Sequence, residues 1–160
     1  ATYYPRLLDA HGRLGSEIYN IKDKYNIDSI AIGDAGLLPY NANVNTLDLG
    51  RLGSAKATHM GLNEDLVDKY DPKIVILRVN RANNQIYMDE VQSIMFEWIN
   101  KKNYVEICDV IFHQQYAMRV YAQVNINEIS KVCSQSQVND ISHHQYIVKT
   151  FYLPPWNFWK

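Results

Sequence analysis

The chain has 160 residues, of which 47% are hydrophobic and 21% are charged, and its formal net charge is −1. This length favours a single domain over residues 1–160 that can bury roughly 70% of the unfolded surface, so neither a metal nor a disulfide is required for a core. The small net charge argues against nucleic-acid binding, which needs a basic excess. No apolar run approaches the roughly 20 residues that span a bilayer.

The first predicted element is an amphipathic helix over residues 5–25, with Pro5 in its first turn. Residues 28–33 follow as a short β-branched run, typical of a strand buried on both faces. A loop begins at Gly33, and residues 44–50 form a second predicted strand. The apolar face of the helix comprises Leu7, Leu8, His11, Leu14, Ile18 and Ile21.

The middle of the chain combines helix and strand signals. Residues 51–62 contain glycines and small side chains, and we expect them to be irregular. Asn63 is typical of a helix cap before an acidic first turn, which predicts a short helix over residues 63–71. Residues 73–79 form the clearest strand, and residues 87–102 carry a helical apolar face that ends in lysines.

The last third changes to a period of two. Residues 104–112 and 116–124 are predicted strands of a hairpin. A helix at 126–135 follows, then a polar stretch at 136–144 and an aromatic tail. Together the elements predict an α/β fold, with a partly parallel, Rossmann-like sheet flanked by helices and an antiparallel C-terminal hairpin.

Cys108 and Cys133 lie far apart in the sequence and lack CxxC spacing. They could pair if the domain is extracytoplasmic, so the sequence leaves a disulfide between them as an alternative. Isolated cysteines are more typical of buried free thiols, which is the interpretation that the sequence favours. Cys108 also falls in a strand-like apolar run, where a thiol is typical of an inert core.

The loop that starts with Gly33, Asp34, Ala35 and Gly36 is a candidate ligand site, because ligands of doubly wound sheets bind beyond the carboxyl ends of strands. It contains neither GxGxxG nor GxxxxGK[ST], so we expect no nucleotide cofactor and no other cofactor. The residue pattern favours a structural role instead. In that interpretation Asp34 hydrogen-bonds its own loop and the glycines adopt positive φ.

Catalytic and metal signatures are absent elsewhere. Asp34 and Asp48 could form the carboxylate pair of a glycoside hydrolase, although spacing alone does not fix their separation. No GxSxG surrounds a serine, so we expect no catalytic residue in the isolated chain. We also expect no metal site, because neither HExxH nor a Cys–His pattern includes any of the histidines, which are His11, His59, His113, His143 and His144.

One stretch resembles a known family. Residues 28–53, "DSIAIGDAGLLPYNANVNTLDLGRLG", followed after a short helix by "YDPKIVIL", look like the soluble C-terminal domain of bacterial polytopic membrane glycosyltransferases of the GT-C type. Those that act on lipid-linked sugars as mannosyl- and arabinosyltransferases often carry such a domain. In that group a first strand ends in GDAG-x-x-x-Y, and a second carries an aspartate in D-x-x-G-L.

The match to these motifs can be followed residue by residue. Gly33, Asp34, Ala35, Gly36 and Tyr40 fit the first motif. Asp48 fits the carboxylate of the second, although "DLGRLG" reverses the order of its last two residues. Asn41 also departs from the group, because a second tyrosine is usual there.

The resemblance implies an accessory domain that is non-catalytic in isolation and belongs to a longer membrane protein. It implies a location at the cell membrane, on the extracytoplasmic, periplasmic side. The implied partners are the membrane-embedded part of the same chain and a glycan or polyprenyl-phosphate sugar. Asp34, Gly36, Tyr40 and Asp48 are the implied ligand-binding residues.

Two alternatives come from other functional classes. The chain could be a free-standing glycan or small-molecule binding module, or a small hydrolase that uses Asp34 and Asp48. It could also be an interaction domain that presents Trp156, Phe158 and Trp159 of the aromatic tail. The simpler interpretation of that tail is a segment that closes over the core.

Overall fold

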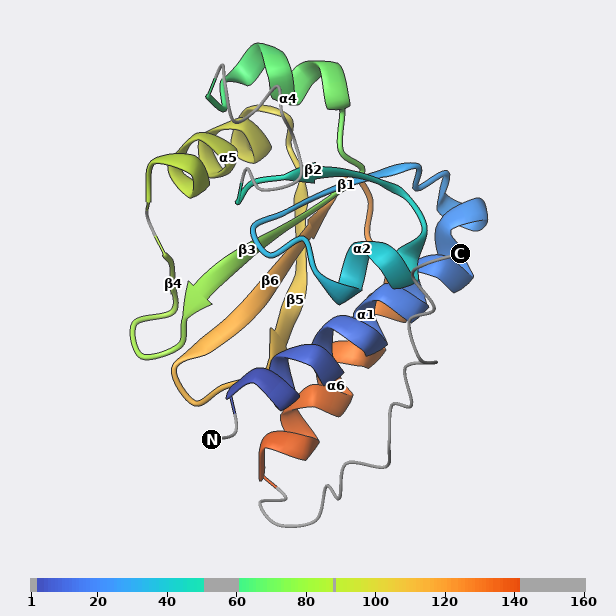
Figure 1. The fold of residues 1–160 in the computed structure, drawn as a ribbon, viewed down its shortest axis with the longest axis vertical. Coiled ribbons are helices and arrows are strands. Elements are labelled where there is room, and N and C mark those ends of the chain that lie inside the picture. Colours follow the sequence, from blue (N-terminus) through green and yellow to red (C-terminus); the bar gives the residue numbers. More distant parts are fainter. Residues whose placement is uncertain (1–2, 51–60, 88, 142–160) are drawn as a thin grey trace, which may run out of the picture.

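The computed structural model describes residues 3–50, 61–87 and 89–141. It shows a mixed α/β fold with a six-stranded sheet and helices on both of its faces (Figure 1). The predicted fold class is therefore confirmed. In chain order the elements are α1 (Tyr3–Tyr25), β1 (Ser29–Ile32), α2 (Leu37–Ala42), β2 (Asn45–Asp48), α4 (Glu64–Tyr70), β3 (Ile74–Asn80), β4 (Gln85–Ile86), α5 (Glu90–Lys101), β5 (Val105–Ile111), β6 (Tyr116–Ala122) and α6 (Asn127–Ile141).

The sheet has the strand order β2-β1-β3-β6-β5, and β4 pairs with β3. β1 is parallel to β2 and β3, whereas the β5–β6 hairpin joins the sheet antiparallel to β3. The pairing of β1 with β3 ends at Ile32 and Ile76, and β4 takes up the same strand only at Val79. Among the described residues, Leu77 is thus paired with neither strand on that side, whereas the carbonyl of Arg78 accepts a backbone hydrogen bond of 2.8 Å from the amide of Tyr87, next to β4.

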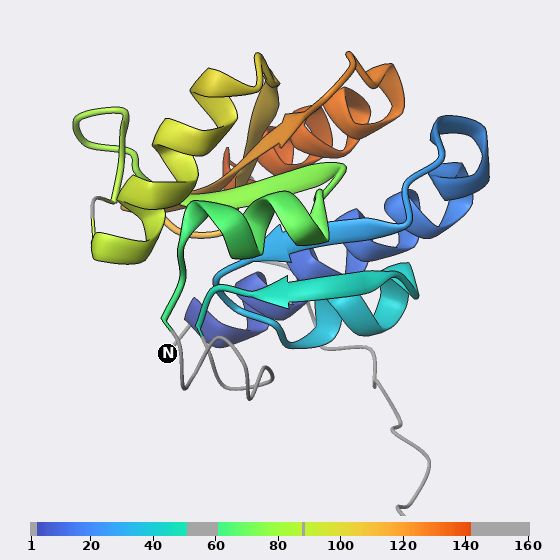
Figure 2. The same ribbon diagram turned by 90° about the horizontal axis from the view of Figure 1, so that it is seen from above.

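Two cores lie on opposite faces of the sheet. Alternate residues of β3 explain the division, because Ile74 and Ile76 join the core under α1, α2 and α6, and Val75 and Leu77 join the core under α4 and α5. The two views show α1 and α6 side by side on their face of the sheet (Figures 1 and 2). Burial on both faces explains why this strand is a continuous apolar run in the sequence.

Helix α2 occupies part of the stretch predicted to be a loop. Its Pro39 stands in the first turn, where a backbone N–H has no intrahelical acceptor, so the helix tolerates it. The helix packs closely on α1 at Gly15, where an added Cβ would lie 2.6 Å from the carbonyl oxygen of Leu38. The missing side chain at Gly15 therefore allows α2 to lie close against α1.

The two helices of the opposite face begin at capped positions. The side chain of Asn63 accepts a hydrogen bond from the amide of Leu66, as its cap-like position predicts. At the start of α5 the side chain of Asp89 accepts one from the amide of Gln92. Each cap satisfies a backbone donor that the helix itself leaves unpaired.

Cys108 and Cys133 form a disulfide, so the preference for free thiols was wrong. The bond joins β5 to α6, whose Cα atoms at these positions are 6.2 Å apart. The pairing depends on α6 returning along β5 after the hairpin, a tertiary contact that cysteine spacing does not encode. Helix α6 also continues to Ile141, through part of the stretch predicted to be a polar connection.

Some predictions fall outside the described residues, namely those for His59, His143, His144, Trp156, Phe158 and Trp159 and for most of the segment 51–62. Within the described residues, no helix has the combination of length and apolar character that a membrane span requires.

Candidate functional site

The ends of β1 and β3 form a crevice that follows from the order of the strands. The chain leaves β1 toward α2 on one face of the sheet, and it leaves β3 through β4 toward α5 on the other face. Ligands of open α/β sheets bind where neighbouring parallel strands diverge in this way. A pocket of about 200 Å³ lies at this point.

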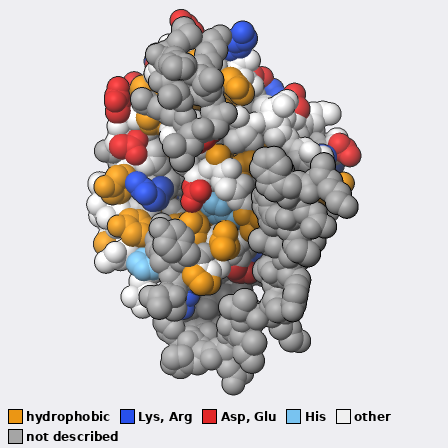
Figure 3. Space-filling view, in the orientation of Figure 1, with side chains coloured by type: hydrophobic (Ala, Val, Ile, Leu, Met, Phe, Trp, Pro, Cys, Tyr) orange, Lys and Arg blue, Asp and Glu red, His pale blue; other side chains and the backbone are white. Residues whose placement is uncertain are grey.

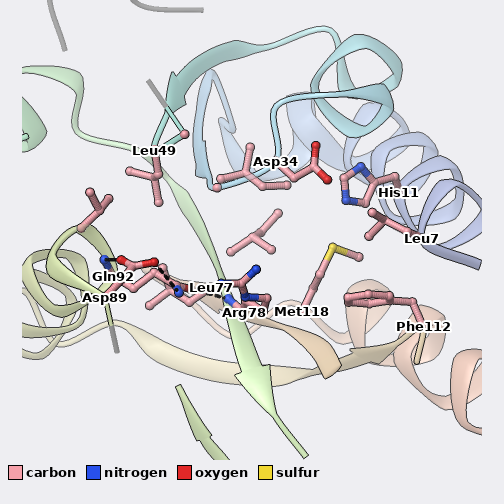
Figure 4. A pocket seen from close by; sticks show the side chains of 15 residues that line it. Leu7, His11, Asp34, Leu49, Leu77, Arg78, Asp89, Gln92, Phe112 and Met118 are labelled. Atoms are coloured by element: carbon pink, nitrogen blue, oxygen red, sulfur yellow. Dashed lines mark hydrogen bonds between the residues drawn. The ribbon is translucent and has the colours of Figure 1, made fainter. Parts of the chain in front are cut away.

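The pocket combines apolar walls with a few polar groups. Its polar side chains are those of His11, Asp34, Arg78, Asp89 and Gln92, and its apolar wall includes Leu7, Leu49, Phe112 and Met118 (Figure 4). On the face drawn in Figure 3, histidine atoms lie beside acidic atoms within a group of hydrophobic side chains. Such a combination is typical of small-molecule sites.

His11 lies on the apolar face of α1, and its side chain is only 1% exposed. Its Nε2 is buried and has no hydrogen-bond partner. Burial lowers the pKa of His11, and the nearby charge of Asp34 opposes this shift without reversing it. His11 is therefore neutral at pH 7, and its Nε2 is left without a partner inside the protein.

Asp34 follows β1 and is exposed at the edge of the pocket. Figure 4 shows its carboxylate directed toward the imidazole of His11. The prediction that Asp34 hydrogen-bonds its own loop is wrong, because within the described residues its carboxylate accepts no hydrogen bond and Gly36, the residue before α2, has no side-chain cap. Gly33 and Gly36 also do not adopt the positive φ expected of them, and Gly36 has a φ of −76°.

Asp48 has the structural role that the sequence assigned to Asp34. It is 5% exposed, and its Oδ1 accepts a hydrogen bond of 2.8 Å from the amide of Gly50. This turn brings Gly50 so close to Gly33 that an added Cβ would lie 2.8 Å from the carbonyl oxygen of Gly33. Asp48 thus shapes the pocket wall from outside, while Leu49 and Gly50 line it.

The remaining two predicted ligand-binding residues are not in the pocket lining. Gly36 is the residue that precedes α2, and Tyr40 is 83% exposed on that helix. Of the four predicted residues, the structure therefore places only Asp34 in the pocket.

Gln92 completes the wall beside β3, beyond the end of β1 (Figure 4). Its Oε1 accepts a 2.6 Å hydrogen bond from the amide of Arg78, and its Nε2 donates a 2.5 Å bond to the carbonyl of Tyr87. The side-chain amide therefore supplies hydrogen bonds that a neighbouring strand would otherwise make. Arg78 in turn lies over the ring of Tyr87, 4.2 Å from its centroid.

Sequence reasoning missed the roles of His11, Arg78 and Gln92. Two of them left a signal in the pattern. His11 is the only polar residue in the apolar series of the first helix, and Arg78 interrupts the most apolar strand of the chain. Gln92 left none, because a glutamine near a helix start is typical of an exposed position.

The chemistry that this lining supports is recognition through hydrogen bonds. It contains a neutral imidazole, carboxylates and a guanidinium, so it offers both donors and acceptors. No serine, threonine, cysteine or lysine is among the described lining residues, whose candidate reactive groups are the carboxylates of Asp34 and Asp89 and the imidazole of His11. The described residues also contain no group of three or more His, Cys, Asp or Glu arranged to hold a metal ion.

Comparisons of the chain with protein-family models, curated proteins and solved structures find no match.

Proposed function

We propose that this domain binds one sugar unit of a glycan in the pocket between the ends of β1 and β3. We further propose that it does so as the extracytoplasmic accessory domain of a membrane glycosyltransferase that uses lipid-linked sugars, and that it is non-catalytic in isolation. The observation that carries the proposal is that His11, whose buried Nε2 has no hydrogen-bond partner, lines the same pocket as Asp34.

A sugar hydroxyl fits this pair chemically. An unsatisfied buried polar atom costs about 1–3 kcal/mol, which a ligand recovers by supplying the missing partner. Hydroxyl groups both donate and accept, so one hydroxyl can donate to Asp34 and another can hydrogen-bond His11. The pocket volume of about 200 Å³ lies below the roughly 300–1,000 Å³ of sites for drug-sized ligands, which favours a single ring.

The proposed membrane context has separate support. The loops that resemble the glycosyltransferase motifs, at Asp34 and at Asp48, follow the adjacent parallel strands β1 and β2. The disulfide between Cys108 and Cys133 favours an oxidising compartment, as expected on the extracytoplasmic side of a membrane. The partners in this proposal are the membrane-embedded part of the same chain and a glycan or polyprenyl-phosphate sugar.

The hydrolase alternative receives less support. A glycosidase needs two carboxylates that flank one glycosidic bond, one of them placed to move a proton. Asp48 is buried in a turn, bonded to the amide of Gly50, and is not part of the pocket lining. A free-standing binding module would use the same pocket, so only the parent protein distinguishes it from an accessory domain.

Binding can be tested by NMR titration of the ¹⁵N-labelled domain with mannose, arabinose and glucose. We expect amide shifts concentrated at Gly33, Asp34, Leu49 and Gly50, which line the pocket. Asp34→Asn should weaken binding about tenfold, the equivalent of one hydrogen bond to a charged group. The matched control is Tyr40→Ala, outside the pocket. Absence of localised shifts with every sugar would contradict the proposal.

The membrane context needs a different test. We expect the coding sequence that precedes Ala1 to specify a series of apolar helices long enough to span a bilayer. An upstream sequence without such helices would rule out the accessory role, but it would leave sugar binding by the pocket intact.

A further inference from the structure

We infer that the sugar recognised by this pocket carries an anionic group, a phosphate or a carboxylate, which the guanidinium of Arg78 binds. This inference rests on the proposed sugar-binding function and specifies its ligand. The shared chemistry of the two groups is a planar or tetrahedral set of oxygens that accepts two parallel N–H bonds.

The position of Arg78 in the fold is the first observation. It lies on a central strand after four buried residues, Ile74 to Leu77, yet it is exposed. It lies two residues beyond Ile76, the last residue of β3 that β1 pairs with, and its carbonyl accepts a backbone hydrogen bond from the amide of Tyr87, next to β4. Beyond the end of β1, the side chain of Arg78 lines the pocket.

The partners of Arg78 are the second observation. Arg13 and Arg119 form ion pairs with Asp9 and Asp109, respectively. Among the described residues, in contrast, the guanidinium of Arg78 forms neither an ion pair nor a hydrogen bond. Arginines with a structural role usually pair with carboxylates. A guanidinium that lines a pocket without such a partner is available to a ligand.

The carboxylates of the pocket are engaged elsewhere. The two oxygens of Asp89 accept hydrogen bonds from Gln92, at 2.8 Å from its backbone amide and at 3.4 Å from its Nε2. Asp34 is directed toward His11 (Figure 4). Within the described residues neither forms an ion pair with Arg78, which is the one cationic side chain of the pocket lining.

Aromatic contacts hold the guanidinium in place. Its central carbon lies 4.2 Å from the centroid of Tyr87 and 6.0 Å from that of Tyr116. Contact with a ring face restricts the plane of the guanidinium while its N–H groups, which point outward in that plane, remain free. This geometry prepares Arg78 for bidentate binding, and the sugar ring can then extend toward His11 and Asp34.

The test compares three probes in calorimetric or NMR titrations: glucose 1-phosphate, glucuronate and glucose. We expect either or both anionic probes to bind the wild-type domain about tenfold more tightly than glucose, and the tighter of the two identifies the source of the charge. Arg78→Gln should remove this preference, so that the three probes bind the variant with affinities within about twofold of one another. Lys131→Gln, which removes one charge from an exposed position on α6, is the matched control and should retain the preference.

Arg78→Lys provides a second variant if Arg78→Gln fails to fold. It retains the charge but not the planar fork, so it should lose most of the preference for the anionic probes. Equal binding of the three probes, or an unchanged preference in both Arg78 variants, would overturn the inference while the sugar-binding function stands. Failure of all three probes to bind would overturn both.

Discussion

The loops after β1 and β2 begin at adjacent parallel strand ends, and each contains an aspartate, but the two carboxylates have opposite roles. Asp34 is exposed, accepts no hydrogen bond within the described residues and faces the pocket. Asp48 is buried and holds the amide of Gly50. The difference teaches that a strand-end carboxylate is available to a ligand only where backbone donors do not already engage it.

The largest expected effect concerns the close contact of the two loops. Gly50→Ala would place a Cβ 2.8 Å from the carbonyl oxygen of Gly33, so we expect a loss of about 2–3 kcal/mol in the free energy of unfolding. Gly33→Ala is the matched control, because no atom beyond its immediate chain neighbours lies within 4 Å of its added Cβ. Urea denaturation measures both. Equal losses would show that the loops do not constrain each other as described.

A second pair of variants separates the two aspartates directly. Asp48→Ala should lower the free energy of unfolding by about 1–3 kcal/mol, since it leaves the amide of Gly50 without its acceptor. Asp34→Ala should change it by less than about 0.5 kcal/mol and should weaken sugar binding instead. The comparison would fail if Asp34→Ala were the more destabilising of the two variants in denaturant titrations.

The pH dependence of the free energy of unfolding tests whether Asp34 interacts with His11. Burial holds the pKa of His11 below its ordinary value of 6.5 in the folded domain, so the unfolded chain takes up this proton first as the pH falls. The contribution of His11 to stability is thus complete above pH 6.5 and decreases as the pH falls from 6.5 toward the folded pKa. We expect His11→Phe to remove this decrease.

Asp34→Asn should have the converse effect on the same curve. The charge of Asp34 raises the pKa of His11, so its removal should extend the loss of stability to lower pH. Denaturation at a series of pH values, with Tyr40→Ala as control, measures the change. An unaltered profile in Asp34→Asn would mean that the carboxylate and the imidazole do not interact.

The smallest effect is expected on α2. Tyr40 belongs to the same motif as Asp34 but is 83% exposed, and its substitution by alanine should change the free energy of unfolding by less than about 0.5 kcal/mol. It should also leave sugar affinity unchanged in the isolated domain. Weaker binding by Tyr40→Ala would instead extend the ligand site across α2.

The sequence predicted the centre of the sheet well because β1 and β3 are buried on both faces, which produces apolar runs such as Ile74 to Leu77. The site was harder to predict. Asp34 and Asp48 are indistinguishable by residue type, and only the path of the backbone decides which one has a free carboxylate. The pocket also depends on His11, Arg78 and Gln92, which lie far apart in the chain and meet only through tertiary packing.

The amide of Gln92 has a consequence for how the pocket operates. Because this side chain satisfies the amide of Arg78 and the carbonyl of Tyr87, the break between β1 and β4 is stable without any ligand in it. The cavity therefore exists before a ligand binds. Ligand entry requires no rearrangement of the strands. Association should be governed by encounter and orientation alone, so differences in affinity between related sugars should arise mainly in their dissociation rates.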